Sequence, residues 1–291
     1  MENTRKKALL VDDPSASYHS NPAWGHSMFE GVRRSPWEAY RRFRTREAER
    51  TISPTLQRTF DDGSAAHAAT LEPDEFPLRF VSSGVEGKRT KDDRAAWQAA
   101  KEAHPTALVM EPSRIERALA IAEAVRAHPV VGPCLERDGV AEGSIYWSDD
   151  EHGIACKCRP DWMVPPSADD NGCIIDLKTT AQIGTEDVAR SVARYGYHRQ
   201  QAHYTAGFRA LYGVHPSAYV LVFACKTPPH EVGAWMLDDG SAELGEEQRR
   251  ADVERVAELM ERPADDWCRA ANRGVSTLVL PTWAHYEGGI E

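Results

Sequence analysis

Two charged residues interrupt an apolar segment near the middle of this chain of 291 residues. The segment Cys173–Thr179 is rich in isoleucine, leucine and threonine, a composition that favours a β-strand. Side chains two positions apart on a strand project from the same face, so Asp176 and Lys178 should lie side by side. A second segment of this kind, Ile154–Val164, carries Asp161 and can form a neighbouring strand. We therefore expect two carboxylates and an ammonium group to meet at one edge of a β-sheet.

The remaining segments indicate an α/β (α+β) fold, in which helices flank a mixed central β-sheet. Val140–Trp147 is a third expected strand, separated from the next one by turn residues. Ala218–Ala224 is apolar throughout, which is typical of a central strand buried on both faces, and Glu231–Leu237 is its expected hairpin partner. Helices are expected over residues 27–34, 37–46, 61–71, 95–103, 113–127, 186–211 with a break near 196, 244–262 and 265–272, whereas 51–59 and 77–94 read as loops.

The order of these elements suggests a single domain rather than two independent ones. We expect residues 1–20 to be a flexible N-terminal segment and residues 21–291 to form the domain. Within it, residues 21–135 would be a helical N-terminal part and residues 136–291 a core that holds the strands. Ser113 and Glu116 have the spacing of a capping box, which would open the helix over residues 113–127.

Charge and hydropathy narrow the class of protein further. No stretch approaches the roughly 18 apolar residues of a membrane-spanning helix, so we expect no membrane partner. The basic start of the chain has no long apolar segment behind it, which favours a cytoplasmic protein. The net charge of −10 argues against a nucleic-acid footprint over the whole surface. A local basic track is still possible, because positive charge is concentrated at Arg33, Arg34, Arg41, Arg42, Arg44, Arg46 and Arg50 and again at Lys88, Arg89 and Lys91.

The chain has six cysteines, which a cytosolic protein would keep reduced. Cys156 and Cys158 would share one face of a strand, but no second pair of ligands follows them to complete a zinc or iron–sulfur site. The simpler interpretation is that they are small buried hydrophobic residues.

The charges at the sheet edge suit metal-assisted hydrolysis of a phosphodiester. Mg²⁺ prefers oxygen ligands and keeps several waters, so two or three carboxylates are enough to bind it. Asp161 and Asp176 would be ligands, and the backbone carbonyl of Leu177 would lie between them. Lys178 would orient or help deprotonate the attacking water and stabilise the developing charge. A surface ion pair is the alternative, although the apolar neighbours make this a costly place for idle charges.

Four other residues are weaker candidates for the same site. His67 lies on a helix of small residues and could bind the metal through a ring nitrogen, or it could be a partly buried structural histidine. Gln200 and Tyr204 are four apart, hence neighbours on one helix face, and could bind phosphate or fix a catalytic carboxylate. The alternative for this pair is an amphipathic helix with its tyrosine in the core. Glu142, on the preceding strand, could be a third carboxylate or a supporting one.

Together these motifs resemble the PD-(D/E)xK nuclease superfamily, and within it the exonuclease VIII (RecE-type) branch related to the RecB nuclease domain. The resemblance covers residues 15–285 and depends on the order of several motifs. They are Cys156-Lys-Cys-Arg-Pro-Asp161, Ile174-Ile-Asp-Leu-Lys-Thr-Thr180, the G-x-x-x-H segment Gly63–His67, the Q-x-x-x-Y motif Gln200–Tyr204, and Leu278-Val-Leu-Pro-Thr-Trp283. The link between the two carboxylate strands, Val164–Cys173, is longer and more polar than is common in the family.

The resemblance implies a PD-(D/E)xK restriction-endonuclease-like core and a Mg²⁺-dependent exonuclease, with Mn²⁺ as a possible substitute. Such an enzyme would degrade one strand of linear double-stranded DNA, 5′→3′, and leave 3′ single-stranded overhangs for recombination. His67, Asp161 and Asp176 would be the metal ligands and Lys178 the catalytic lysine. Gln200, Tyr204, Arg159 and Thr179 would support the site and the DNA strand.

Relatives of this kind form rings through which DNA is threaded and work with a single-strand annealing recombinase. We therefore expect a homo-oligomer, a trimer or tetramer ring, whose channel gathers the two basic clusters. Three alternatives stay open: an end-independent endonuclease, a Cas4-like nuclease, which the lack of a cysteine cluster disfavours, and a catalytically inactive scaffold that binds DNA ends.

Overall fold

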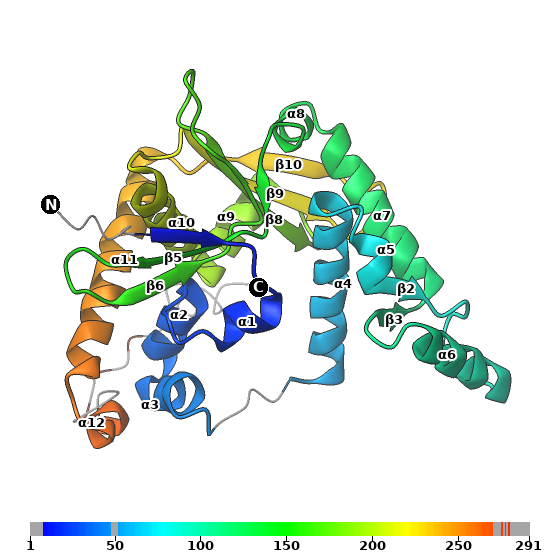
Figure 1. Cartoon of the computed structure of the whole chain (residues 1–291), viewed down its shortest axis with the longest axis horizontal. Coiled ribbons are helices and arrows are strands. Elements are labelled where there is room, and N and C mark those ends of the chain that lie inside the picture. Colours follow the sequence, from blue (N-terminus) through cyan, green and yellow to red (C-terminus); the bar gives the residue numbers. More distant parts are fainter. Residues whose placement is uncertain (1–7, 48–51, 270–274, 276, 278, 280–291) are drawn as a thin grey trace, which may run out of the picture.

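The computed structural model describes residues 8–47, 52–269, 275, 277 and 279 (Figure 1). Its strands are β1 (Ala8–Val11), β2 (Phe80–Ser82), β3 (Leu108–Met110), β4 (Val140–Ala141), β5 (Ser144–Ser148), β6 (Ala155–Cys158), β7 (Trp162–Val164), β8 (Cys173–Thr180), β9 (Ala218–Cys225) and β10 (Val232–Trp235). Its helices are α1 (Ser15–Ser20), α2 (His26–Arg34), α3 (Pro36–Ala39), the π-helical turn η1 (Tyr40–Arg44), α4 (Pro54–Leu71), α5 (Phe76–Arg79), α6 (Lys91–Ala103), α7 (Pro112–Ala127), α8 (Val131–Leu135), α9 (Thr185–Tyr195), α10 (Tyr197–Tyr212), α11 (Asp239–Met260) and α12 (Ala264–Arg269).

A five-stranded mixed sheet, in the order β10-β9-β8-β7-β4, holds the centre of the molecule. β8 and β9 are parallel, with Asp176 opposite Leu221 and Lys178 opposite Phe223, while β7 and β10 run antiparallel to their neighbours. Parallel strands need a long crossover, and α9 and α10 supply it. The predicted mixed sheet flanked by helices is confirmed, as are the central position of β9 and its hairpin with β10.

The two faces of this sheet pack against different helices. Ile175 and Leu177 project toward α4 and α7, where they meet Ala66, Ile121 and Val125. Ile174 projects to the other face and packs in the largest core cluster, with Phe208 of α10. Because side chains alternate along a strand, Asp176 and Lys178 share the face of Ile174 and lie under α10.

Two expected strands are in fact divided between two sheets. Residues 140–147 contribute β4 to the central sheet and β5 to a three-stranded sheet of order β1-β5-β6. Residues 154–164 divide in the same way into β6 and β7. The first division falls at Glu142, whose φ of 49° is left-handed and cannot continue a strand. Pro160, which has no amide N–H to donate to a ladder, lies at the second.

The N-terminal segment is more ordered than we expected. Ala8–Val11 forms β1 and pairs antiparallel with β5, so that Ala8 lies opposite Trp147. The ammonium of buried Lys157 then donates hydrogen bonds to the carbonyls of Tyr18, at 2.6 Å, and Asn21, at 2.8 Å. The expectation of a flexible segment over residues 1–20 is therefore wrong for residues 8–20, because tertiary contacts with β5 and β6 hold them.

Several helix boundaries also differ from the sequence prediction. α4 begins at Pro54, where the Ser53 hydroxyl accepts from the Leu56 N–H at 3.2 Å, so most of the expected loop at 51–59 is helical. The expected loop at 77–94 contains the end of α5, all of β2 and the start of α6. Ser113 does not cap a helix, because its N–H and hydroxyl both donate to the Glu86 carboxylate.

The other helix predictions agree with the structure where it describes them. The break near residue 196 is confirmed, since Gly196 has a φ of 67° between α9 and α10. The last three residues of the expected helix at 265–272 and most of Leu278–Trp283 lie outside the described residues.

The N-terminal helices share one core with the strand-rich part of the chain. Trp24 and Phe29 pack with Ile145, Phe208 and Trp267 in a single buried cluster. Cys156 and Cys158 project into the same cluster, and burial raises the pKa of Cys156 to about 12, so both are structural thiols. Within the described part of the chain, no helix is long and apolar enough to cross a membrane.

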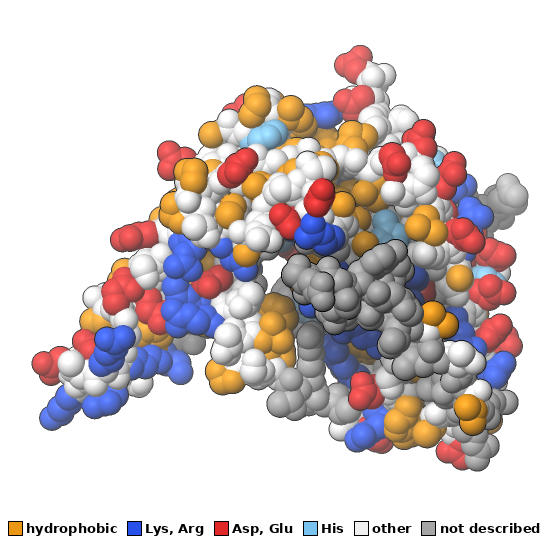
Figure 2. All heavy atoms as spheres, turned by 180° about the vertical axis from the view of Figure 1, so that it is seen from behind, with side chains coloured by type: hydrophobic (Ala, Val, Ile, Leu, Met, Phe, Trp, Pro, Cys, Tyr) orange, Lys and Arg blue, Asp and Glu red, His pale blue; other side chains and the backbone are white. Residues whose placement is uncertain are grey.

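The two basic clusters lie on separate parts of the molecule. The arginines belong to α2 and η1 and the residues around them, and the described ones include Arg33, which pairs with Asp252, and Arg34, which pairs with Glu30. The cluster with Lys88 leads into α6, on the projecting part of the molecule where Figure 2 shows several basic side chains. α4 lies between these two parts in Figure 1.

Candidate active site

The end of β8 places a buried carboxylate and an ammonium group side by side. Lys178 Nζ lies 2.7 Å from Asp176 Oδ2, and Asp176 is fully buried. The other oxygen, Oδ1, accepts a hydrogen bond from Gln200 Nε2 of α10 at 3.1 Å. The strand periodicity thus brings Asp176 and Lys178 together as expected, and Gln200 fixes the orientation of the carboxylate.

Asp161 joins this pair from the residue just before β7. Its Oδ2 accepts a hydrogen bond from the Leu177 N–H at 2.6 Å, which ties it to the backbone between Asp176 and Lys178. Its Oδ1 lies 3.5 Å from Nδ1 of His67. One carboxylate oxygen is thus held by β8 while the other faces α4.

An unusual backbone conformation places Glu142 in the site. Its left-handed φ of 49° turns the chain between β4 and β5, and its N–H donates to the Asp161 carbonyl at 3.1 Å. Its Oε1 lies 4.0 Å from His67 Nδ1. A non-glycine residue in this conformation costs of order 1–3 kcal/mol, so the surrounding structure must hold it there.

His67, Glu142 and Asp161 form a cluster that could hold a metal ion, since one ligand atom from each lies within 4.8 Å of the others. This set differs from the predicted His67, Asp161 and Asp176. Glu142 takes the third place, while Asp176 is turned toward Lys178 and Gln200. The Leu177 N–H donates to Asp161, and the role of the Leu177 carbonyl as a metal ligand stays a prediction.

α4 brings His67 to the sheet through small side chains. Ala65 and Ala66 are fully buried, as are their neighbours Ala68 and Ala69, so the helix backbone approaches β8 closely. At Gly63, one turn earlier, a methyl group would lie 3.8 Å from Thr179 Oγ1, an ordinary contact. Thr179 therefore lies next to the middle of α4.

The concentration of negative charge shifts the pKa values of the site. Burial and the nearby Asp161 raise the pKa of Glu142 to about 7, and burial raises that of Asp176 to about 6 although Lys178 opposes the shift. Burial alone would lower the pKa of Lys178, but Asp176 and Asp161 hold it above its usual value. Lys178 is therefore an ammonium ion in this structure.

His67 and Asp161 shift each other's pKa values in the same way as Asp176 and Lys178 do. Burial would lower the pKa of His67, but the Asp161 and Glu142 carboxylates raise it. Burial would raise the pKa of Asp161, whereas His67, Lys178 and the hydrogen bond from Leu177 together lower it. The lowered pKa of Asp161 favours its ionised form, and the raised pKa of His67 favours its protonated form.

The other predicted residues lie around this centre. Arg159 is engaged by Asp13 Oδ1 at 2.7 Å and by the Ser144 hydroxyl, so it braces the wall of the site. Tyr204 is partly buried near Tyr18 and Asp176, and loss of solvent holds its pKa well above the usual value. A cavity of about 810 Å³ opens over His67, Glu142 and Arg159, and α1 and α4 form its other walls.

The sequence analysis did not assign a role to Tyr197, the first residue of α10. Its ring centroid lies 4.8 Å from Lys178 Nζ, a cation–π contact. Gly196 was the sequence signal that could have identified Tyr197. A helix break at Gly196 makes Tyr197 the first residue of the helix that carries Gln200.

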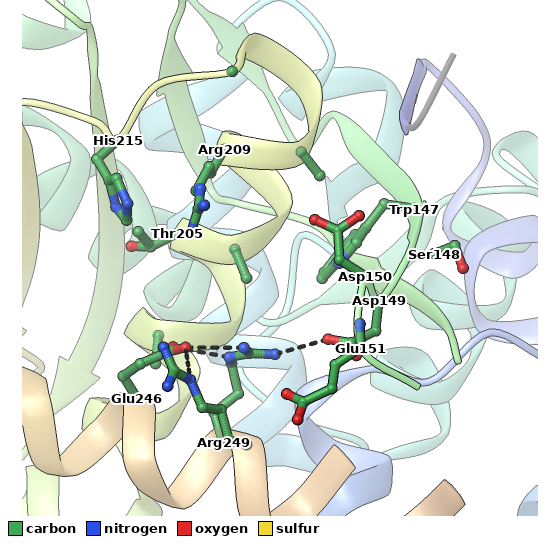
Figure 3. A pocket seen from close by; sticks show the side chains of 15 residues that line it. Trp147, Ser148, Asp149, Asp150, Glu151, Thr205, Arg209, His215, Glu246 and Arg249 are labelled. Atoms are coloured by element: carbon green, nitrogen blue, oxygen red, sulfur yellow. Dashed lines mark hydrogen bonds and ion pairs between the residues drawn. The ribbon is translucent and has the colours of Figure 1, made fainter. Parts of the chain in front are cut away.

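A second cavity, of about 570 Å³, lies on another side of α10 (Figure 3). Ala202, Ala206 and Arg209 of α10 line one wall, and Arg249 of α11 lies at its base. Arg249 binds both carboxylate oxygens of Glu246 at 2.9 Å and lies 3.5 Å from Asp149 Oδ2. These partly buried charges are thus paired with one another.

Comparisons with known proteins agree with this geometry. A family model described as "PDDEXK-like domain of unknown function" (DUF3799) matches residues 25–270. A crystal structure of a Eubacterium rectale protein named "Putative exonuclease" aligns with a TM-score of 0.54 and 14% identity over 96% of this chain and 100% of that one, which shows a shared fold. The crystal structure of SSO0001 aligns with a TM-score of only 0.27 and 12% identity over 65% of this chain and 84% of that one, and carries no argument. No curated protein matches the sequence.

Proposed function

We propose that this chain, which belongs to the family of PDDEXK-like domains (DUF3799), is a metal-dependent exodeoxyribonuclease. The observation that carries the proposal is the meeting of three carboxylates, an imidazole and an ammonium group at the edge of the central sheet. A site built only for stability would not gather Glu142, Asp161 and Asp176 around one lysine, because like charges in a buried site destabilise it.

The donor set suits a hard divalent cation. His67, Glu142 and Asp161 would hold it, and carboxylate oxygens with waters are the ligands that Mg²⁺ prefers. Mn²⁺ is a plausible substitute, since it accepts the same oxygen ligands. When bound, such an ion lowers the pKa of a coordinated water and offsets the charge of the phosphate.

The chain's own residues would carry the remaining work. The ammonium of Lys178 is positioned to orient the attacking water or to stabilise negative charge on the phosphate oxygens. Gln200 keeps Asp176 in contact with Lys178, so that the lysine stays aimed at the site. The Glu142 carboxyl, with a pKa of about 7 without a metal, would release its proton on binding the ion, so metal binding should strengthen as the pH rises.

The proposed substrate and polarity rest on the order of the sequence motifs, which resembles that of the RecE-type exonucleases. We propose that the substrate is linear double-stranded DNA, degraded on one strand, 5′→3′, to leave 3′ overhangs for recombination or repair. The name of the E. rectale protein, which describes an exonuclease, supports this choice of class. A ring of several chains in the cytoplasm, working with a single-strand annealing recombinase, would bring the two separate basic clusters toward one DNA channel.

The test uses linear duplex labelled at the 5′ or the 3′ end, a covalently closed circle of the same sequence, and Mg²⁺ or EDTA. We expect Mg²⁺-dependent release of the 5′ label as mononucleotides, and an intact circle. Cleavage of the circle would instead identify an end-independent nuclease. Binding of linear duplex without any nucleotide release, with Mg²⁺ or Mn²⁺, would identify a scaffold that binds DNA ends.

A further inference from the structure

A pair of tyrosines extends outward from the catalytic lysine. The Tyr197 ring lies over Lys178 Nζ, and the Tyr195 ring follows it at 5.7 Å between centroids, with 31° between the ring planes. Tyr197 is half-buried, whereas Tyr195 is 47% exposed. The two rings thus form a short aromatic path from the cutting centre to the surface.

The backbone between the two tyrosines is fixed. Gly196 has a φ of 67°, and a side chain there would be strained and would meet the His26 ring at 3.7 Å. His26 also hydrogen-bonds to the backbone of Tyr195. α9 ends at Tyr195 and α10 begins at Tyr197, so the two rings are held by helix ends rather than by a loose loop.

A cation lies beside the exposed ring. The guanidinium carbon of Arg194 is 5.6 Å from the Tyr195 ring centroid, and Arg194 is exposed. An exposed cation–π contact contributes only about 0.5–1 kcal/mol, so Arg194 can leave the ring for a phosphate at little cost. An aromatic face with an adjacent arginine is the combination with which proteins hold single-stranded nucleic acid.

We propose that Tyr195 and Tyr197 stack on the terminal nucleobase of the DNA strand that is being cut. This inference rests on the proposed function and adds how the enzyme holds the end of its DNA substrate. Within a duplex both faces of a base are covered by its neighbours, so a tyrosine can reach a base face only at the end of a strand or after unpairing. The platform therefore selects a DNA end and holds its first nucleotide with the phosphate near Lys178.

The experiment compares two linear duplexes that differ only in the terminal nucleotide, adenosine or an abasic residue, at the 5′ end and separately at the 3′ end. The variants are Tyr195→Leu, Tyr195→Trp, and Leu119→Ala as the control. Leu119 is 48% exposed, close to the value for Tyr195, but lies on α7 at the opposite face of the sheet. Initial rates with Mg²⁺ give kcat and KM for each substrate.

We expect the unmodified protein to have a KM roughly tenfold lower for the terminal base than for the abasic end. Tyr195→Leu should remove that difference with kcat on the abasic duplex unchanged, and Tyr195→Trp should retain it. Leu119→Ala should behave as the unmodified protein does.

Two results would overturn the inference and leave the proposed function intact. One is equal KM values for both ends in the unmodified protein, and the other is a base preference that survives in Tyr195→Leu. If the unmodified protein hydrolyses neither duplex, the proposed function itself fails, and the inference fails with it.

Discussion

Two clusters of charged side chains lie on different sides of α10, and they differ in charge balance. In the cavity of Figure 3, Arg249 binds both oxygens of Glu246 and faces Asp149, and Arg250 also contacts Glu246. At the sheet edge, Glu142, Asp161 and Asp176 face one ammonium and one imidazole. The first cluster is close to neutral, and the second has surplus negative charge.

The pKa shifts of the two clusters differ accordingly. Burial would raise the pKa of Glu246, but its bonds to Arg249 and Arg250 lower it below the ordinary value. The pKa of Glu142 is instead raised, to about 7, by burial and by Asp161. A paired carboxylate stabilises the fold by itself, whereas a raised pKa marks a group that lacks a cation. The comparison therefore separates a structural ion cluster from a site that awaits a ligand.

The largest expected effect is on catalysis at the second cluster. Lys178→Ala should lower kcat for Mg²⁺-dependent cleavage by about 10³-fold, because it removes the ammonium that stabilises charge on the phosphate. DNA binding, measured by fluorescence anisotropy, should persist. Arg249→Met should cut DNA at a normal rate under conditions where it is folded. Robust digestion by Lys178→Ala would disprove the assignment of the site.

The next effect is on stability at the first cluster. Arg249→Met should lower the free energy of unfolding by about 1 kcal/mol, because Asp149 loses its ion pair and Glu246 keeps only Arg250 as a partner, in a partly exposed place. Urea denaturation in EDTA measures the change. A loss below about 0.5 kcal/mol would mean that solvent screens these carboxylates well, and the contrast between the clusters would lose its basis.

A smaller effect on catalysis is expected for the residue that orients Asp176. Gln200→Ala should lower kcat at saturating Mg²⁺ by about 10- to 100-fold, because Asp176 would no longer be held in contact with Lys178. Gln201→Ala is the matched control, since Gln201 is the next residue of α10 and has no bond to Asp176. Equal kcat values for the two variants would show that the hydrogen bond to Asp176 has no role.

The sequence was most informative where strand periodicity alone decides the geometry. Asp176 and Lys178 share a face because they are two apart on β8, and the apolar neighbours that predicted the strand also bury it. Gln200 reaches Asp176 because α10 begins directly after Gly196, a break that the sequence marks. For these residues, local pattern and tertiary position agree.

Other positions depend on contacts that no local pattern records. Glu142 reaches the His67 cluster because a left-handed residue divides the expected strand, and glutamate is not a residue that signals such a turn. β1 exists only because β5 offers it an edge, and Ser113 leaves its expected cap because Glu86 is nearby. The sequence could therefore indicate the chemistry of the site but not which carboxylates share His67.

The smallest expected effect is on the pH dependence of folding stability, and its sign differs between the two clusters. Folding raises the pKa of Glu142 from 4.5 to about 7, so the folded protein holds this proton more tightly than the unfolded chain does. In EDTA, its contribution to stability is full below pH 4.5 and is lost as the pH rises to about 7. Glu142→Gln should therefore be more stable than the unmodified protein at pH 8, by about 1 kcal/mol after allowance for partial exposure.

Glu246→Gln should change the stability in the opposite direction. Because its pKa is lowered in the folded protein, Glu246 stabilises above its ordinary pKa and loses that contribution as the pH falls. This variant should be less stable than the unmodified protein at neutral pH and no different in acid. Mg²⁺ should raise the melting temperature of the unmodified protein and of Glu246→Gln, but not of Glu142→Gln, since only the last lacks a ligand. If Mg²⁺ stabilised all three equally, the ion would bind elsewhere, and the surplus negative charge at the sheet edge would need another explanation.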